Sequence, residues 1–229
     1  MAGNLAERLA QVREQIERAA HKAGRNAGEV TLIAVSKTHP ASVLRAAIEA
    51  GAGVFGENKV QEAEEKILEI GRDKAVWHFI GHLQSNKARK AVRIFDAIHT
   101  LDSIELAGRL ERICIEENVS TLSVFAQVDL AREATKSGID EKDLPELIEF
   151  LRGCPHLQLE GLMTLPPFFE DVERVRPFFA KLRGLRDALL PEGKLSMGMS
   201  HDFPAAIEEG ATHVRVGTAI FGERDYSNR

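Results

Sequence analysis

The sequence predicts an α/β fold with a single domain, a (β/α)₈ (TIM) barrel with an extra N-terminal helix. Three observations lead to this expectation: short apolar segments alternate with helical ones, the connections are short, and the chain has 229 residues. Alternating strands and helices produce a parallel sheet with helical crossovers, and eight such units in about 250 residues are typical of a closed barrel. An open, doubly wound sheet is the alternative. No linker or shift in composition divides the chain, so residues 1–229 are expected to form one domain.

The extra helix is expected within residues 1–25. Asn4 and Glu7 have the spacing of a capping box, and Gly24 is a suitable end point. Apolar side chains recur at helical spacing at Leu5, Leu9, Val12, Ile16 and Ala20. We expect this apolar face to pack on the barrel and to cover the gap that a final helix would fill, because little of the chain follows the last predicted strand.

The strands are predicted from short runs rich in apolar and β-branched residues, bounded by glycine, proline or polar residues. These runs lie at residues 30–35, 53–56, 77–80, 97–101, 122–130, 157–165, 194–199 and 213–216. The helices between them are predicted at residues 41–50, 59–70, 86–94, 104–117, 144–151, 172–190 and 204–209. Asp102 or Ser103 is expected to cap the fourth of these helices. Pro177 is expected to break or restart the helix at 172–190.

Composition and charge exclude several classes of partner. The net charge of −5 argues against non-specific affinity for nucleic acid or an anionic membrane. The two cysteines, Cys114 and Cys154, form neither a disulfide framework nor a CxxC metal motif, which favours a reducing compartment. No apolar stretch approaches the length of a membrane span, and charged residues interrupt the N-terminus, unlike a signal peptide. We therefore expect a cytoplasmic protein and a monomer, with a weak dimer as the alternative.

Lys37 is the most informative single residue. It ends the apolar run at 32–36, and the turn Thr38–Pro40 follows at once. A short apolar run that stops at proline is typical of a buried strand. Partial burial of a lysine at such a strand end disfavours the ammonium and favours the neutral, nucleophilic amine that Schiff-base chemistry requires. Taken alone, such a lysine is more often a solvated loop residue, so other residues must support the assignment of Lys37 to Schiff-base chemistry.

Small and polar residues also follow the last two predicted strands, at the end where TIM barrels carry their functional groups. They are Ser200 and the pair Gly217–Thr218. Small residues allow backbone N–H groups to approach a phosphate, and hydroxyl groups add donors. We therefore predict a phosphate site here. Taken singly, Ser200 is also compatible with a helix cap and Gly217–Thr218 with a simple turn.

Arg215 lies inside the last predicted strand and points to the opposite side from Val214 and Val216. A guanidinium stays charged and needs acceptors inside a barrel. Two interpretations are open. One is a salt bridge with Glu57 or Asp102, and the other is a donor to a ring nitrogen or an acid group of a bound ligand.

A metal site is not predicted. His78 and His82 do not lie on a helix, and no further ligand stands at a fixed metal-site spacing from them. The sequence also contains no GxxxxGK[ST] loop, no GxSxG motif and no GxGxxG motif, which leaves the strand-end residues as the candidate site.

Several longer motifs occur in one order along the chain. They are AVSK at 34–37, FGEN at 55–58 with QE at 61–62, WHFIGHLQSNK at 77–87, GLMT at 161–164, SMGMS at 196–200 and VRVGTAIFG at 214–222. Together they resemble the pyridoxal phosphate homeostasis protein family (the YggS/PROSC family). The resemblance runs from the N-terminal helix almost to the last residue.

The resemblance implies a barrel of the alanine racemase N-terminal type that binds pyridoxal 5′-phosphate (PLP) and helps to balance vitamin B6 and amino-acid pools. The positions that match the family's cofactor site are Lys37 for covalent attachment as a Schiff base and, for binding, Asn58, Met199, Ser200, Arg215, Gly217 and Thr218. Among them, Ser200, Gly217 and Thr218 match phosphate-binding positions. Arg215 matches the contact to the pyridine nitrogen, and Asn58 a polar neighbour of the cofactor.

Two positions depart from the family's pattern. His201 follows Ser200 where many relatives carry alanine. Asp129 stands where relatives often carry asparagine, in the segment before Ser137–Gly138. Neither residue is expected to touch Lys37, so they bear on the mouth of the site more than on PLP binding.

The arginine at the ring position bears on whether the chain is an enzyme. PLP stabilises a carbanion best when its ring nitrogen is protonated, and an arginine cannot accept that proton. Alanine racemase also uses a second domain and a tyrosine of the partner subunit. This chain is expected to lack that domain, and its single tyrosine, Tyr226, lies close to the C-terminus. We therefore expect a PLP carrier or regulator.

Three hypotheses remain open. In the first, the chain buffers PLP or delivers it to apo forms of PLP-dependent enzymes. In the second, it is a fold-type III PLP enzyme, such as an amino-acid racemase, with Lys37 as the base. In the third, it resembles a class I aldolase in which Lys37 forms a Schiff base with a sugar-phosphate carbonyl and no PLP binds.

Overall fold

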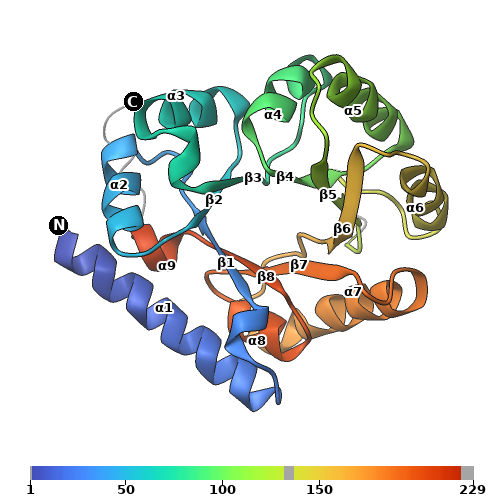
Figure 1. Ribbon diagram of the computed structural model, residues 1–229. Coiled ribbons are helices and arrows are strands. Elements are labelled where there is room, and N and C mark those ends of the chain that lie inside the picture. The colour runs from blue at the N-terminus through green and yellow to red at the C-terminus, as the bar shows by residue number, and fades with distance from the viewer. Residues whose placement is uncertain (1, 132–136, 223–229) are drawn as a thin grey trace.

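The computed structural model describes residues 2–131 and 137–222. Residues 132–136, in the segment between Asp129 and Ser137, and Tyr226 lie outside the described residues. Eight parallel strands close into a barrel whose order follows the chain (Figure 1). They are β1 Thr31–Val35, β2 Val54–Glu57, β3 Val76–Phe79, β4 Ala97–Leu101, β5 Leu122–Gln127, β6 Leu157–Met163, β7 Lys194–Met199 and β8 His213–Val216. Because β1 pairs with β8, the closed barrel confirms the predicted fold class and excludes the open sheet.

Helices surround the barrel (Figure 1). They are α1 Ala2–Lys22, α2 Ala41–Glu49, α3 Val60–Ile70, α4 Ala88–Ile94, α5 Ile104–Glu116, α6 Leu144–Arg152, α7 Arg176–Leu189, α8 Phe203–Glu208 and α9 Thr218–Phe221. Short 3₁₀ helices lie at η1 Ala27–Glu29, η2 Arg72–Lys74, η3 Ser85–Lys87 and η4 Val172–Arg174. Pro177 stands in the first turn of α7, which confirms that the predicted helix restarts there. Ser103 caps α5, because its Oγ accepts a hydrogen bond from Leu106 N at 3.2 Å.

Three predicted boundaries were wrong. Asn4 lies inside α1 and does not cap it, because the helix already begins at Ala2. The strand predicted at 122–130 ends at Gln127, because the backbone then pairs with Ile139 outside the barrel ladder. Val128 forms an isolated bridge with Ile139, and the Ile139 N–H donates to the Gln127 carbonyl at 2.8 Å. The strand predicted at 157–165 ends at Met163, shortly before Pro166 and Pro167, which have no N–H to donate.

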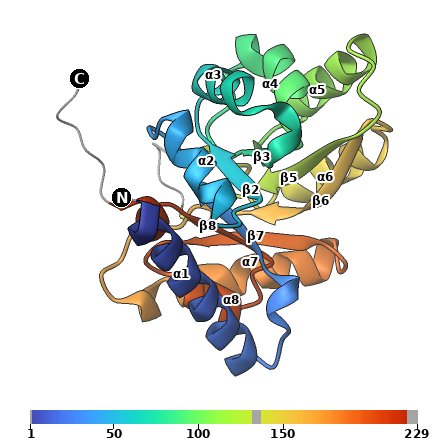
Figure 2. The ribbon, with the colours of Figure 1, turned by 60° about the vertical axis from the view of Figure 1, so that its left-hand side comes forward.

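The N-terminal helix packs on the outside of the barrel, as predicted. α1 contacts α8, α9 and α2, and it lies along α8 in both views (Figures 1 and 2). Four members of its predicted apolar face are buried, namely Leu9, Val12, Ile16 and Ala20. α9, which the sequence did not predict, follows β8 directly and contacts α1.

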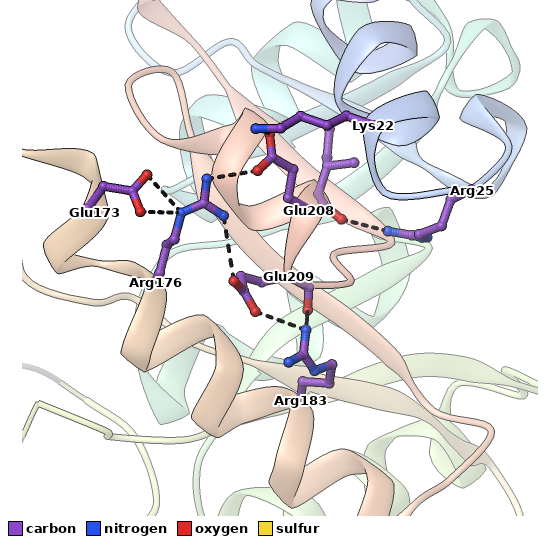
Figure 3. Close-up of polar contacts among 8 residues, drawn as sticks. Lys22, Arg25, Glu173, Arg176, Arg183, Glu208 and Glu209 are labelled. Atoms are coloured by element: carbon purple, nitrogen blue, oxygen red, sulfur yellow. Dashed lines mark hydrogen bonds and ion pairs between the residues drawn. The ribbon is translucent and has the colours of Figure 1, made fainter.

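An ion network ties α8 to its neighbours (Figure 3). Arg176 at the start of α7 contacts Glu173 at 2.9 Å, Glu208 at 2.8 Å and Glu209 at 3.5 Å. Lys22 at the end of α1 reaches Glu208 at 2.8 Å. We call these five residues the α8 clamp. Because α8 begins directly after the loop that follows β7, the clamp fixes the helix next to that loop.

The barrel interior contains a cluster of histidines. His78, His99 and His213 are buried, and the centroid of the His99 ring lies 4.1 Å from that of Phe125. Barrel interiors are usually filled by branched apolar side chains, so these polar rings are unusual. Burial lowers the pKa of His78 to about 4 and that of His213 to about 3, which keeps both rings neutral near pH 7.

Cys114 and Cys154 are buried free thiols. Burial raises the pKa of Cys114 to about 11, so this thiol stays protonated and is a poor nucleophile near pH 7. Among residues 2–131 and 137–222, no helix has both the length and the apolar character needed to cross a membrane.

Candidate functional site

A cavity of about 330 Å³ opens at the C-terminal ends of the strands. Its walls include residues that end or follow β1, β2, β3, β7 and β8, and this is the end of the barrel at which TIM barrels carry their sites. All of the predicted site residues line it, namely Lys37, Asn58, Met199, Ser200, Arg215, Gly217 and Thr218. The fold thus brings together side chains from four separate parts of the chain.

Lys37 reaches the cavity because of the alternation of side chains along β1. Val35 lines the cavity, whereas Ser36 is fully buried on the opposite side. Successive side chains of an extended chain point to opposite faces, so Lys37 returns to the side of Val35, where it is half-buried. The chain then turns at Thr38, whose φ of +69° is uncommon for a residue other than glycine.

A buried charge network anchors this strand end from outside the barrel. Lys66 on α3 donates to the carbonyl of Ser36 at 2.8 Å and to Glu57 Oε1 at 2.6 Å. It also donates to Glu62 at 2.7 Å, and the Ser36 hydroxyl donates to Glu57 Oε1 at 2.6 Å. Burial raises the pKa of Glu57, and the positive charge of Lys66 partly offsets that effect. The peptide group next to Lys37 is therefore held in place by a buried ion pair.

Arg215 is 3% exposed and extends from β8 to the wall of the cavity. Its Nη1 donates to Ser196 Oγ at 2.7 Å, and its Nη2 donates to the Thr164 carbonyl at 2.9 Å. The interpretation as a salt bridge with Glu57 or Asp102 was wrong. Glu57 points away from the barrel interior toward α3, and among the described residues Asp102 forms no ion pair.

The hydroxyl of Ser200 joins the loops that follow β7 and β8. Ser200 Oγ accepts hydrogen bonds from the backbone N–H groups of Gly217 at 3.0 Å and Ala219 at 3.4 Å. Ser200 does not cap α8, because that position belongs to Asp202. The pair Gly217–Thr218 is not a simple turn either, since α9 begins at Thr218. Small residues and N–H groups thus gather at one side of the cavity.

Gly198 and Asp202 shape the loop between β7 and α8. Gly198 has a φ of +93°, and a Cβ there would lie 2.6 Å from the Cβ of Ala206, so only glycine fits. The carboxylate of Asp202 accepts a hydrogen bond from Met199 N at 2.6 Å. Burial raises the pKa of Asp202, against the effects of this hydrogen bond and of the positive charge of Arg215.

Asn58 presents a polar atom that lacks a partner. Its Oδ1 is buried and forms no hydrogen bond with any described residue. The backbone of Asn58 is fixed by a close approach to Gly81, where a Cβ would lie 2.1 Å from the Asn58 carbonyl oxygen. A buried polar atom without a partner is costly, so a bound polar group would satisfy Asn58.

The two departures from the family pattern lie in different places. His201 lines the mouth of the cavity, where its ring centroid lies 5.2 Å from that of the exposed Phe168 and its Nε2 contacts the Glu170 carbonyl at 3.2 Å. Asp129 does not line the cavity, and its Oδ1 accepts a hydrogen bond from Ala131 N at 3.1 Å. Of the two positions, only His201 can affect access to the cavity directly.

Sequence reasoning missed several residues that complete the site. They are Lys66, Ser196 and His99, whose contacts join strands and helices that are far apart in the sequence. Only the i, i+4 spacing of Glu62 and Lys66 indicated one of these contacts, the ion pair on α3. No group of three or more His, Cys, Asp or Glu side chains suited to a metal ion occurs among the residues that the structure describes.

Comparisons with known proteins decide the family. The model of the alanine racemase N-terminal domain matches residues 8–225. The pyridoxal phosphate homeostasis protein of Aquifex aeolicus is 43% identical over 97% of this chain and 100% of its own length. The chain belongs to the pyridoxal phosphate homeostasis protein family. The relative of the same name from Escherichia coli K12 is 44% identical over 99% of both chains, so the family covers the whole barrel.

Solved structures share the barrel fold of this chain. PipY of Synechococcus elongatus, solved with PLP bound, is 42% identical with a TM-score of 0.83, covering 95% of this chain and 100% of PipY. Alanine racemase of Corynebacterium glutamicum is 20% identical with a TM-score of 0.65, covering 97% of this chain and 61% of the racemase. The second likeness concerns the fold alone.

Proposed function

We propose that this chain binds PLP at the barrel mouth, holds it as a Schiff base on Lys37, and buffers it or delivers it to apo forms of PLP-dependent enzymes. The observation that carries the proposal is the convergence of all the predicted cofactor residues on one cavity. The name shared by the Aquifex and Escherichia relatives, and the PLP bound in PipY, support it. The proposed compartment is the cytoplasm and the proposed state a monomer.

The groups around the cavity fit the chemistry of PLP. PLP supplies an aldehyde that condenses reversibly with a primary amine and releases water, and Lys37 supplies the amine. Arg215 uses two of its five N–H groups within the protein and retains donors for a ring nitrogen. Ser200 Oγ accepts from the Gly217 N–H and keeps its own hydrogen to donate to the phosphate, and the Thr218 hydroxyl would add a second donor. The unpartnered Oδ1 of Asn58 supplies a further polar contact.

Arg215 favours a carrier over an enzyme. Burial lowers the pKa of Arg215 to about 10, so the guanidinium remains a cation near pH 7 and cannot accept a proton from a ring nitrogen. A ring nitrogen without a proton makes PLP a weak electron sink, which fits a carrier or at most a racemase-like reaction. The alternative, a fold-type III enzyme such as an amino-acid racemase, is supported by the shared fold.

The first experiment tests binding and its attachment point. Purified wild-type protein incubated with PLP is expected to turn yellow, and Lys37→Ala to stay colourless after gel filtration. Lys59→Ala is the matched control, because Lys59 is exposed and does not line the cavity. A wild-type protein that stays colourless would overturn the proposal and would favour the aldolase-like hypothesis, in which no PLP binds.

A second experiment separates a carrier from an enzyme. Holo-protein is mixed with an apo form of a PLP-dependent enzyme, and recovery of that enzyme's activity is followed over time. Recovery without turnover of any member of a panel of L-amino acids supports the carrier. Racemisation of an amino acid that is lost in Lys37→Ala would establish the alternative.

A further inference from the structure

Arg215 is a buried cation whose partners are uncharged. Its guanidinium donates to the Ser196 hydroxyl at 2.7 Å and to the Thr164 carbonyl at 2.9 Å. Within the described part of the chain, no carboxylate lies at ion-pair distance from it. The negative charge of Asp202 favours the Arg215 cation from beyond ion-pair distance, and the dipoles around Arg215 supply its direct contacts, so the orientation of those dipoles matters.

The contact with Ser196 continues as a row of hydrogen bonds that leads away from the cavity. Ser196 Oγ lies 2.9 Å from His99 Nδ1, and His99 Nε2 lies 2.9 Å from His78 Nδ1. All three side chains are buried, and none of them lines the cavity. We call Ser196, His99 and His78 the relay. It crosses the barrel interior from β7 through β4 to β3.

One direction of donors satisfies the whole row. Arg215 can only donate, so Ser196 Oγ accepts from it and its hydroxyl hydrogen is available for His99 Nδ1. His99 then carries its hydrogen on Nε2 and donates it to His78 Nδ1. In the opposite direction both Arg215 and His99 donate to Ser196, and the hydroxyl hydrogen has no acceptor among the described residues. Every hydrogen bond therefore points away from the cation.

The surroundings keep both relay histidines neutral. Burial lowers the pKa of His99 well below its ordinary value, and the neighbouring His78, His213 and Arg215 act in the same sense. Burial also lowers the pKa of His78. The negative charge of Asp96 opposes this shift, and the positive charge of Lys194 adds to it. With neutral rings, each Nδ1 is free to accept a hydrogen bond, as the row requires.

We propose that Ser196, His99 and His78 are positioning residues for the cofactor site. Ser196, oriented by His99 and His78, holds Nη1 of Arg215, and the Thr164 carbonyl holds Nη2, so that the remaining N–H groups of the guanidinium are available to the cavity. A guanidinium is a rigid planar fork, and anchoring Nη1 and Nη2 fixes the whole group. This inference rests on the proposed function, because the group that Arg215 is positioned to meet is the PLP ring.

The chain offers a matched pair of variants. His99→Leu removes a member of the relay. His213→Leu removes a ring from the same buried cluster, but the Nδ1 of His213 contacts Thr212 Oγ1 at 3.0 Å, which lies outside the relay. We expect His99→Leu and Ser196→Ala to raise the Kd for PLP roughly ten-fold, as for loss of a hydrogen bond to a charged group, and to shift the visible band of the holo-protein. His213→Leu should leave both unchanged.

Two further measurements keep the inference testable. Ser196→Thr keeps the hydroxyl that Ser196→Ala removes, so it should show the wild-type visible band. A purely structural role of Ser196 would not require this difference between the two variants. Nitrogen-15 NMR should show His99 and His78 as neutral rings protonated on Nε2, in the apo-protein and in the holo-protein alike. If His99→Leu does not fold, Ser196→Ala, which removes one oxygen atom, decides the question.

The outcomes separate this inference from the proposed function. If wild type binds PLP on Lys37 while Ser196→Ala and His99→Leu keep the wild-type band and Kd, the relay is overturned and the proposed function stands. Equal shifts in His99→Leu and His213→Leu, or rings protonated on Nδ1, also overturn the relay. A wild-type protein that takes up no PLP overturns both proposals.

Discussion

At the scale of single residues, the position of Lys37 depends on its neighbours as much as on its own side chain. The apolar run before it and Pro40 after it predicted a strand end, and the structure places Lys37 at one. Lys66 could not be predicted in the same way. Its contact with the Ser36 carbonyl depends on how α3 packs against β1 and β2, which the sequence pattern does not specify.

Removal of the Lys66 ammonium is expected to be strongly destabilising. Lys66→Met would leave Glu57 buried without its ion-pair partner, a change that costs about 3–5 kcal/mol of the free energy of unfolding. Urea denaturation measures it, with the exposed Lys59→Met as control. The double variant Glu57→Leu/Lys66→Met should recover much of the loss, because both charges are then absent. A single variant as stable as wild type would show that the ion pair contributes nothing.

At the scale of elements, the sequence predicted strands and helices well and loop contacts poorly. Pro177 marked the restart of α7, because proline fits the first turn of a helix and not its interior. The ends of β5 and β6 were predicted too late, because apolar residues continue past the last ladder hydrogen bonds. The short helix α9 was missed, since four residues carry no periodic signal.

The α8 clamp gives a prediction at this scale (Figure 3). Arg176→Leu would leave Glu173, Glu208 and Glu209 close together without the shared cation. We expect a loss of about 1–2 kcal/mol in the free energy of unfolding, larger at low salt than at high salt. Arg152→Leu is the control, since its pair with Glu149 is largely exposed and should contribute almost nothing. Equal losses in the two variants would contradict a special role for the clamp.

At the scale of the whole molecule, the closed barrel brings distant residues together. The alternation of strands and helices, the chain length and the strand-end residues were enough to predict the fold and the edge of the barrel at which the cavity opens. The polar interior was not predictable, because His78, His99 and His213 sit in apolar runs that differ little from an ordinary barrel core. Their proximity depends on how the strands close in space, which brings the ring centroids of His78 and His99 to 4.9 Å and those of His78 and His213 to 6.2 Å.

Those buried histidines predict acid sensitivity. Their pKa values are lowered in the folded state, so below about pH 6.5 the unfolded chain binds more protons and the free energy of unfolding falls as pH falls. The loss continues until the pH reaches the folded pKa values, about 4 for His78 and about 3 for His213. Urea midpoints measured from pH 8 to pH 4 in wild type and His213→Leu test this. The variant should show a shallower fall, and parallel curves would contradict the argument.

The central claim, that Lys37 is the attachment point of PLP, has one direct test. Holo-protein is reduced with sodium borohydride, digested, and mapped by mass spectrometry. We predict a phosphopyridoxyl group on the peptide that contains Lys37 and no labelled peptide in Lys37→Ala treated in parallel. Labelling of other lysines to the same extent in wild type and Lys37→Ala, with Lys37 unmodified, would contradict it.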